Sequence, residues 1–229
     1  RMKKTVVFFS SCALDGQGVP DPFMLQELPW LLAHFDRVLV CSYYGAAELT
    51  EPRPEHVTAV MPAFAKLRAK LATPFCGELW RELRHLRRDG KMNVTNAVKL
   101  ALFAMRGLML QNAVEPLLRR DEQTTLYAYW LSYDGFAAAL CKARHPEMRA
   151  LARCHAFDID VTRNAMNPYL MKRFMGEALD EIYPISRYAK GMLDVCAPMP
   201  PQKIHVVGMG SAGEAATRRL PPPFWEDGT

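Results

Sequence analysis

The sequence lacks the cysteine spacings that mark metal sites and redox motifs. Its six cysteines are scattered, with no CxxC or CxxH pattern. Three of them, Cys41, Cys141 and Cys154, lie inside apolar periodic segments, where a reduced thiol behaves as a small hydrophobic group. No secretory leader pattern is found either, so we expect a reducing cytoplasm as the compartment.

A long uninterrupted hydrophobic run is also missing. The most apolar long stretch, Val98 to Leu118, is too polar for the hydrocarbon core of a membrane. Its polar residues are Lys99, Arg106, Gln111, Asn112 and Glu115. We therefore expect no transmembrane segment.

Two further motifs are absent, and each absence argues against one kind of site. Gly16 and Gly18 follow the first apolar run without forming GxGxxG, so a dinucleotide-binding fingerprint is not supported. Ser186 lies outside any GxSxG elbow, which argues against a hydrolase nucleophile. The glycine pair is equally consistent with a loop that approaches a ligand and with an ordinary turn.

The remaining composition is typical of a soluble globular protein. Half of the 229 residues are apolar and 23% are charged, enough to bury a sizeable core. Short apolar runs alternate with helical patterns, which predicts an α/β fold with a doubly wound, mostly parallel, Rossmann-like sheet of about seven strands. The expected strands are 4–9, 37–41, 57–61, 125–129, 150–152, 181–185 and 203–207. The expected helices cover 21–35, most of 63–120 with breaks near 73–74 and 89–90, 136–144, 169–178 and 187–195.

Polar side chains follow two successive strand candidates between Leu151 and Leu193. The run 150–152 leads into Arg153 and His155, and the run 181–185 ends at Ser186. Open α/β sheets bind ligands at the carboxyl ends of their strands. We therefore expect a ligand site at this edge, with the glycine loop after the first strand on the same side.

The C-terminal part of the sequence resembles a known family. Three runs carry the resemblance: YAYWLSYDGFAAALCKARHPEMRALARCHAFDIDVTRN, YLMKRFMGEALDEIYPISRYAKGML and KIHVVGMG. They resemble the N-terminal half of a GT-B glycosyltransferase, in particular the retaining family-4 enzymes of bacterial surface polysaccharide assembly. The resemblance covers residues 125–210 and is only topological before that.

One family motif falls on the first of the two polar strand ends. An Arg-x-His-x-Phe/Tyr-Asp run is matched by Arg153, His155, Phe157 and Asp158. The resemblance implies that His155 is catalytic and contacts the reacting sugar, and that Arg153 and Asp158 bind substrate on the acceptor side. A structural histidine that caps a strand is the alternative for His155.

The family's other motifs fall on later and earlier loops. A Pro-x-Ser step after a strand is matched at Ser186, which the resemblance implies is polar lining of the cleft. A glycine before the crossing to a second domain is matched by Gly208 or Gly210. The loop with Gly16 and Gly18 corresponds to one that approaches the donor phosphates.

The resemblance also implies a division into domains. Residues 1–210 would form the N-terminal, acceptor-side domain, and 211–229 would be a linker toward a donor-binding domain. In the family that second domain carries paired glutamates that hold the nucleotide sugar. We therefore expect the 229-residue chain alone to be inactive in sugar transfer and to bind nucleotides only weakly.

The implied reaction is transfer of a sugar from a nucleotide-diphosphate donor to a growing, lipid-linked glycan at the inner face of the membrane. Neither a metal nor another cofactor is expected, and retention of the anomeric configuration follows from the resemblance alone. One alternative is a metal-binding DxD formed by Asp158 and Asp160. Another is a non-catalytic module that binds a glycan or a partner protein.

Positive charge is concentrated in one segment. The net charge of the chain is +5. Residues 66–91 contain eight basic and three acidic residues, so the net charge of this segment, +5, equals that of the whole chain. The charges alternate with leucines and one phenylalanine, a pattern that fits a solvated helix face or a helix on an anionic membrane surface. No aromatic stacking platform accompanies them, so nucleic acid is not expected as a partner.

Overall fold

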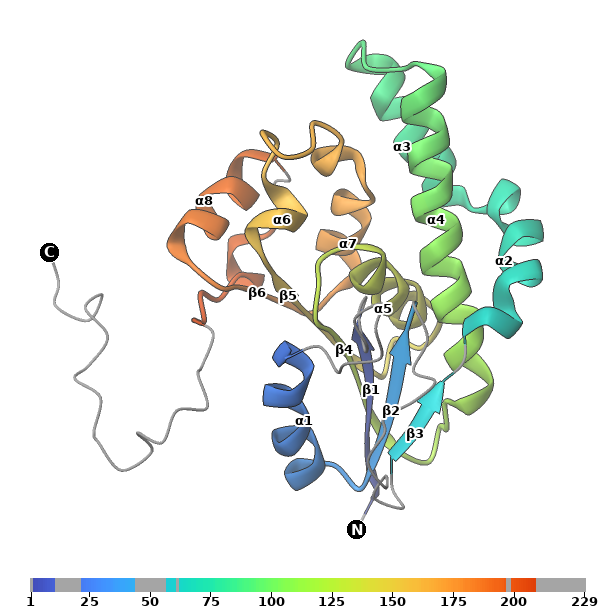
Figure 1. The fold of residues 1–229 in the computed structure, drawn as a ribbon, viewed down its shortest axis with the longest axis vertical. Coiled ribbons are helices and arrows are strands. Elements are labelled where there is room, and N and C mark those ends of the chain that lie inside the picture. The colour runs from blue at the N-terminus through green and yellow to red at the C-terminus, as the bar shows by residue number, and fades with distance from the viewer. Residues whose placement is uncertain (1, 11–21, 44–56, 61, 197–198, 209–229) are drawn as a thin grey trace, which may run out of the picture.

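A six-stranded parallel sheet lies at the centre of the computed structural model, which describes every residue except 1, 11–21, 44–56, 61, 197–198 and 209–229 (Figure 1). The strand order is β3-β2-β1-β4-β5-β6, the order of Rossmann-like folds. All strands are parallel, and successive strands are added on one side of β1 up to β3 and on its other side from β4 onward. The strands are β1 (Lys4–Ser10), β2 (Arg37–Ser42), β3 (Val57–Val60), β4 (Gln123–Ala128), β5 (Arg149–Cys154) and β6 (Glu181–Pro184).

The central strands are apolar on both faces because helices cover both sides of the sheet. In β1, Val7 and Phe9 face one cluster of buried side chains, and Val6 and Phe8 face another. Each of these four residues is fully buried. Such continuous apolar runs are typical of parallel strands covered on both faces, as the sequence indicated.

The described residues form eight α-helices, of which α2 and α3 pack against α4 rather than on the sheet (Figure 1). α1 contributes Leu31 to one face of the sheet, and α4, α5 and α7 contribute to the larger core on the other face. This is a doubly wound arrangement, as expected. The helices are α1 (Pro22–His34), α2 (Lys66–Ala72), α3 (Gly77–Arg88), α4 (Val94–Val114), α5 (Tyr133–Arg144), α6 (Ala156–Ile159), α7 (Lys172–Ala178) and α8 (Arg187–Cys196).

The long helical segment between β3 and β4 breaks where the sequence predicts. A 3₁₀ turn that contains Pro74 separates α2 from α3. Gly90, with φ of 65°, ends the turn after α3, a left-handed conformation that favours glycine. α4 then begins after Asn93, whose side chain accepts a hydrogen bond from the N–H of Asn96 at 2.8 Å.

α4 qualifies by length and composition as a candidate membrane span, although the polar residues between Val98 and Leu118 argued against one. Together with the following turn, Val94–Leu117 has the length and composition of a membrane span, the one such helix in the described part of the chain. However, 56% of its apolar window is buried inside the protein, where α4 packs against α5. A core helix of a folded domain has these properties too.

The expected seventh strand is wrong for the described residues. Residues 203–207 form a single bridge, Ile204 to Ile182, beside β6. Two backbone hydrogen bonds, His205 N–H to the Ile182 carbonyl and Val207 N–H to the Pro184 carbonyl, hold this segment along the sheet edge. Pro201 opens a 3₁₀ turn immediately before it, which shortens the extended part.

Other boundaries also differ from the prediction: β4 begins at Gln123 and α5 at Tyr133, each earlier than expected. β5 runs through Cys154, so Arg153 lies inside the strand rather than after it. α7 begins only at Lys172, because a 3₁₀ turn over 167–169 and a left-handed Met171 precede it.

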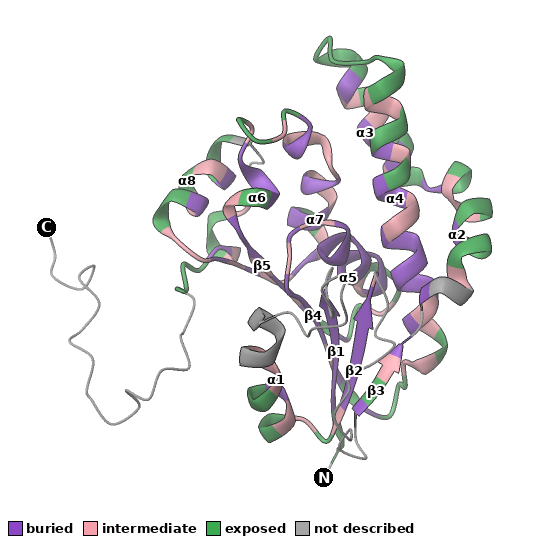
Figure 2. Cartoon of the chain, in the orientation of Figure 1, coloured by how far each residue is buried: buried purple, intermediate pink, exposed green. Residues whose placement is uncertain are grey.

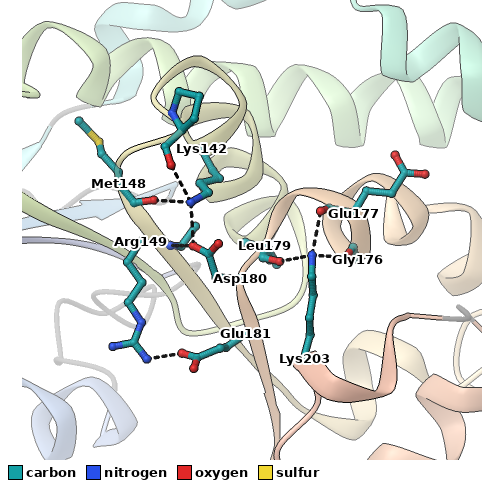
Figure 3. A network of polar contacts seen from close by, with 11 residues as sticks. Lys142, Met148, Arg149, Gly176, Glu177, Leu179, Asp180, Glu181 and Lys203 are labelled. Atoms are coloured by element: carbon teal, nitrogen blue, oxygen red, sulfur yellow. Dashed lines mark hydrogen bonds and ion pairs between the residues drawn. The ribbon is translucent and has the colours of Figure 1, made fainter.

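A polar network ties together β5, β6 and the end of α7 near the amino ends of the strands (Figure 3). The Lys142 ammonium donates to the Met148 carbonyl at 2.7 Å and pairs with Asp180 at 3.0 Å. The ammonium of Lys203 donates to three backbone carbonyls at the end of α7, those of Gly176, Glu177 and Leu179. Carbonyls at a helix C-terminus lack intrahelical partners, so Lys203 caps α7.

Candidate functional site

Two adjacent strands, β4 and β5, bring aromatic side chains together at their carboxyl ends. Tyr129 and Trp130 follow β4, and His155 follows β5. The ring centroids of Trp130 and His155 are 4.2 Å apart, and those of Tyr129 and His155 are 5.2 Å apart. Because β4 pairs with β1 where the strand order reverses, this cluster lies beside the position where doubly wound sheets bind ligands.

The polar atoms of this cluster are buried without partners. His155 is only 7% exposed, yet neither of its ring nitrogens makes a hydrogen bond within the part of the chain described. The indole Nε1 of Trp130 is likewise buried without a partner there. Most buried polar atoms in proteins are hydrogen-bonded, and leaving one unpaired costs roughly 1–3 kcal/mol. These nitrogens therefore lack, among the described residues, the partners that buried polar atoms usually have.

Asp158 holds the backbone of His155 in place by hydrogen bonding. Its Oδ2 accepts hydrogen bonds from the N–H of His155 at 3.0 Å and from the N–H of Leu131 at 3.1 Å. The same oxygen lies 3.7 Å from His155 Nδ1, too far for a hydrogen bond. Asp158 is 4% exposed, so its visible role is to position His155 and the loop after β4. Its expected contact with substrate stays a prediction.

Asp158 and Asp160 use their carboxylates in different places. Asp160 Oδ1 accepts from the N–H of Thr162 at 2.8 Å and from its hydroxyl at 2.6 Å. These hydrogen bonds lower the pKa of Asp160 below its ordinary value, and the bond from the Thr162 hydroxyl has the larger effect. Among the described residues, no group of three or more His, Cys, Asp or Glu side chains is placed to hold a metal ion. Asp160 therefore stabilises a turn, whereas Asp158 holds the backbone of Leu131 and His155.

Arg153 lies next to the cluster but faces α1. Its guanidinium forms an ion pair with Glu27 of α1 at 2.9 Å, and both side chains are less than one-fifth exposed. The guanidinium carbon also lies 5.7 Å from the ring centroid of Tyr129, a cation–π contact. Arg153 is therefore connected to the site through Tyr129.

The remaining predicted site residues are spread along the same edge or lie outside the described residues. Ser186 follows β6, and its hydroxyl accepts from the N–H of Ala189 at 3.1 Å, which caps α8. Gly208 is exposed, and a Cβ built on it meets no atom within 4 Å. Gly16 and Gly18 fall in the undescribed stretch 11–21, and Gly210 in 209–229.

Sequence reasoning missed Trp130. The signal was available, because Trp130 lies two residues after an apolar strand, close to the strand end that His155 follows in the next strand. Tryptophan is usually interpreted as a core residue, however, and only the strand order brings the two rings into contact.

The basic segment 66–91 divides into two surfaces. On α3, Leu79 and Leu86 are buried in the core. On α2 and the turn after it, Leu67, Leu71 and Phe75 are 70%, 65% and 88% exposed, and Lys66, Arg68 and Lys70 alternate with them in the sequence. Figure 2 shows α2 mostly in the colour of exposed residues. Half-exposed Trp80 lies close by, with its indole N–H donating to the Pro74 carbonyl at 2.7 Å.

Comparison of the chain with protein-family models gives no match, and comparison with curated proteins gives none either. The functional interpretation therefore depends on the geometry of the carboxyl edge and on the residue pattern it carries.

Proposed function

We propose that this chain is the N-terminal, acceptor-side half of a glycosyltransferase that uses a nucleotide-diphosphate sugar in surface polysaccharide assembly. The observation that carries the proposal is the contact between the tilted rings of His155 and Trp130 at the carboxyl edge of the sheet, whose buried ring nitrogens have no hydrogen-bond partner among the described residues. The match of Arg153, His155, Phe157 and Asp158 to the family motif supports the same assignment.

In the proposed reaction the bond between the sugar carbon and the donor phosphate breaks, and the nucleoside diphosphate leaves with the bonding electrons. An acceptor hydroxyl forms the new glycosidic bond and gives up its proton. A ring N–H of His155 donates a hydrogen bond to a sugar hydroxyl or phosphate oxygen whose negative charge grows as the bond breaks. A donor held in place before the reaction stabilises that charge without reorganisation.

The nucleotide itself is expected to bind mainly to a second domain that follows residues 211–229. The His155 backbone is anchored by β5 and by Asp158, so its ring keeps a constant position relative to the carboxyl edge of the sheet. Preorganisation of this kind is what makes a single hydrogen bond effective in a transition state.

We also propose that the apolar patch of Leu67, Leu71 and Phe75, with Trp80 beside it, lies on the surface of an anionic membrane. Exposed aromatic and leucine side chains within a basic segment are typical of interfacial helices. This location would bring the acceptor edge close to a lipid-linked glycan at the inner face of the membrane.

A non-catalytic glycan- or partner-binding module is the alternative. The two functions are separated by assaying the complete protein encoded by the gene with UDP and GDP sugars and a membrane-lipid extract. Release of nucleoside diphosphate that depends on the extract supports transfer. Binding of a glycan without any turnover of a nucleotide sugar would instead support the module.

A further inference from the structure

A groove separate from the His155 cluster lies between α4 and the segment 161–170 that follows α6. It consists of two adjoining hollows of about 230 Å³ and about 430 Å³, which share Lys99, Asn164 and Met166. Phe103 and Met166, both buried, form part of its apolar floor. The segment 161–170 is held in place by Asn167, whose amide donates to the carbonyls of Phe157 and Asp160.

Four cationic side chains line this groove: Lys91, Lys99, Arg106 and Arg163. No Asp or Glu lines it within the part of the chain that the structure describes. Lys91 and Lys99 take part in no ion pair between described residues, and Arg163 makes only a long contact of 3.5 Å with Asp160 at the surface. The lining of the groove therefore carries positive charge, and two carboxylates that contact lining residues, those of Asp160 and Asp89, lie outside the lining.

Arg106 is oriented by aromatic rings rather than by a carboxylate. Its guanidinium carbon lies 5.1 Å from the ring centroid of Tyr43 and 5.5 Å from that of Tyr133. Its Nε is buried and makes no hydrogen bond to a described residue. An arginine held in this way retains its donor geometry for an anion, and the planar guanidinium suits phosphate oxygens.

An apolar stripe runs along α4 beside the groove. Val94, Val98 and Leu102 recur every fourth residue and are 81%, 51% and 45% exposed. Leu102 also lines the groove itself, so the stripe and the cationic lining are continuous. A ligand with a phosphate head and a hydrocarbon tail fits this combination better than an inorganic anion or a neutral glycan does.

We propose that this groove binds the phosphate of an amphiphilic phosphate ester, with its hydrocarbon lying along Val94, Val98 and Leu102. Its role as the site for the lipid-phosphate part of the acceptor rests on the proposed glycosyltransferase function. The binding itself does not, because it requires neither a donor sugar nor His155.

The test measures binding of three probes to the 229-residue chain by calorimetry. Farnesyl diphosphate, used below its micelle concentration, carries both phosphate and hydrocarbon, whereas inorganic pyrophosphate carries only phosphate. UDP represents the phosphate of a donor. We expect farnesyl diphosphate to bind at least about tenfold more tightly than pyrophosphate or UDP, because hydrocarbon is buried only with that probe.

Two sets of variants test the phosphate-binding and the hydrocarbon-binding parts of the groove separately. Lys99→Glu is expected to weaken farnesyl diphosphate and pyrophosphate alike by about tenfold or more. Lys3→Glu, the same charge change just before the amino end of β1, is the matched control and should change the affinity for neither probe. Val98→Asp and Leu102→Asp should weaken farnesyl diphosphate and leave pyrophosphate within about twofold.

Equal effects of Lys99→Glu and Lys3→Glu would overturn the groove as a phosphate site. UDP binding as tightly as farnesyl diphosphate, with no effect of the stripe variants, would overturn the amphiphilic ligand. His155→Ala should leave all three affinities unchanged. A loss of sugar transfer without a loss of farnesyl diphosphate binding therefore separates the catalytic proposal from this one.

Discussion

The carboxylate of Asp158 accepts a hydrogen bond from the backbone N–H of Leu131, 3.1 Å away and 27 residues earlier in the chain. The carbonyl of the same Leu131 accepts a hydrogen bond from the buried ammonium of Lys172 at 2.6 Å. Because Asp158 also holds the N–H of His155, one carboxylate joins the loop after β4 to the loop after β5. Trp130 and His155 are thereby kept in contact.

Replacement of Asp158 should therefore destabilise the protein. In Asp158→Ala two buried N–H groups lose their acceptor, which we expect to cost about 3 kcal/mol and to lower the Tm by roughly 6–12 °C. Asp158→Asn keeps one acceptor oxygen and should recover part of the loss. Thermal melts followed by circular dichroism measure both. Asp121→Ala, at an exposed residue, is the control and should change the Tm very little. A Tm shift as small for Asp158→Ala would contradict the role given to the Asp158 carboxylate.

His155→Ala should leave the fold intact and impair transfer by the complete protein. The ring makes no hydrogen bond to a described residue, so its removal should shift the Tm by only a few degrees. Loss of a preorganised donor typically costs ~3 kcal/mol, or about a hundredfold in rate. Initial rates of nucleoside diphosphate release, normalised to folded protein, measure this effect.

The matched control is His145→Ala, at a histidine that contacts Glu115 at 2.8 Å and lies between the end of α5 and the start of β5. That variant should lose some stability and keep its rate. If His155→Ala instead melts much earlier and transfers sugar at the normal rate per folded molecule, His155 is a structural residue.

Trp130→Phe isolates the indole N–H. Phenylalanine keeps an aromatic ring next to His155 but removes the Nε1 donor, which has no partner among the described residues. We expect unchanged or slightly higher stability and a transfer rate lowered by about tenfold, since one neutral hydrogen bond to the substrate is lost. An unchanged rate would mean that Trp130 supplies only packing.

Glu82 should make stability depend on pH. Burial raises its pKa from the ordinary value of 4.5 to about 7, against the opposing effects of Arg173 and Arg81. The folded state therefore keeps the proton more readily than the unfolded state. This contribution to stability is fully present below pH 4.5 and is lost as the pH rises through about 7.

Glu82→Gln removes the titration and should raise the free energy of unfolding at pH 8 by on the order of 1–3 kcal/mol, with little effect at pH 4.5. Chemical denaturation at the two pH values tests this difference. Exposed Glu147→Gln should show no such dependence. A gain for Glu82→Gln that is equal at both pH values would rule out titration as its cause.

The exposed patch on α2 should bind anionic vesicles. Leu71→Ser with Phe75→Ser removes two strongly exposed apolar side chains and should reduce co-sedimentation with anionic vesicles by about tenfold. Binding of the unchanged protein should weaken with salt, since each basic residue near the surface contributes ~1 kcal/mol. Val195→Ser, at a residue on α8 that is 81% exposed, is the control. Equal partitioning to neutral vesicles would identify the basic segment as a solvated face.

The sequence alone determined the elements and the place of His155. Continuous apolar runs predicted the six strands together with a seventh, at 203–207, that the structure reduces to one bridge, and Pro74 and Gly90 predicted the breaks among α2, α3 and α4. His155 was identified because it lies just beyond one of these runs and within the motif that resembles the glycosyltransferase family. All of these signals lie within windows of about ten residues, and such short-range patterns reflect local conformational preference and burial.

Only the tertiary structure decided which residues meet. The contact of Trp130 with His155 and the bond of Asp158 to Leu131 depend on the pairing of β4 with β5. The division of the basic segment into a buried leucine face on α3 and an exposed one on α2 depends on what packs against each helix. The cationic groove likewise joins Lys99 to Arg163, far apart in sequence. Long-range pairing is set by the free energy of the whole core, which no local pattern encodes.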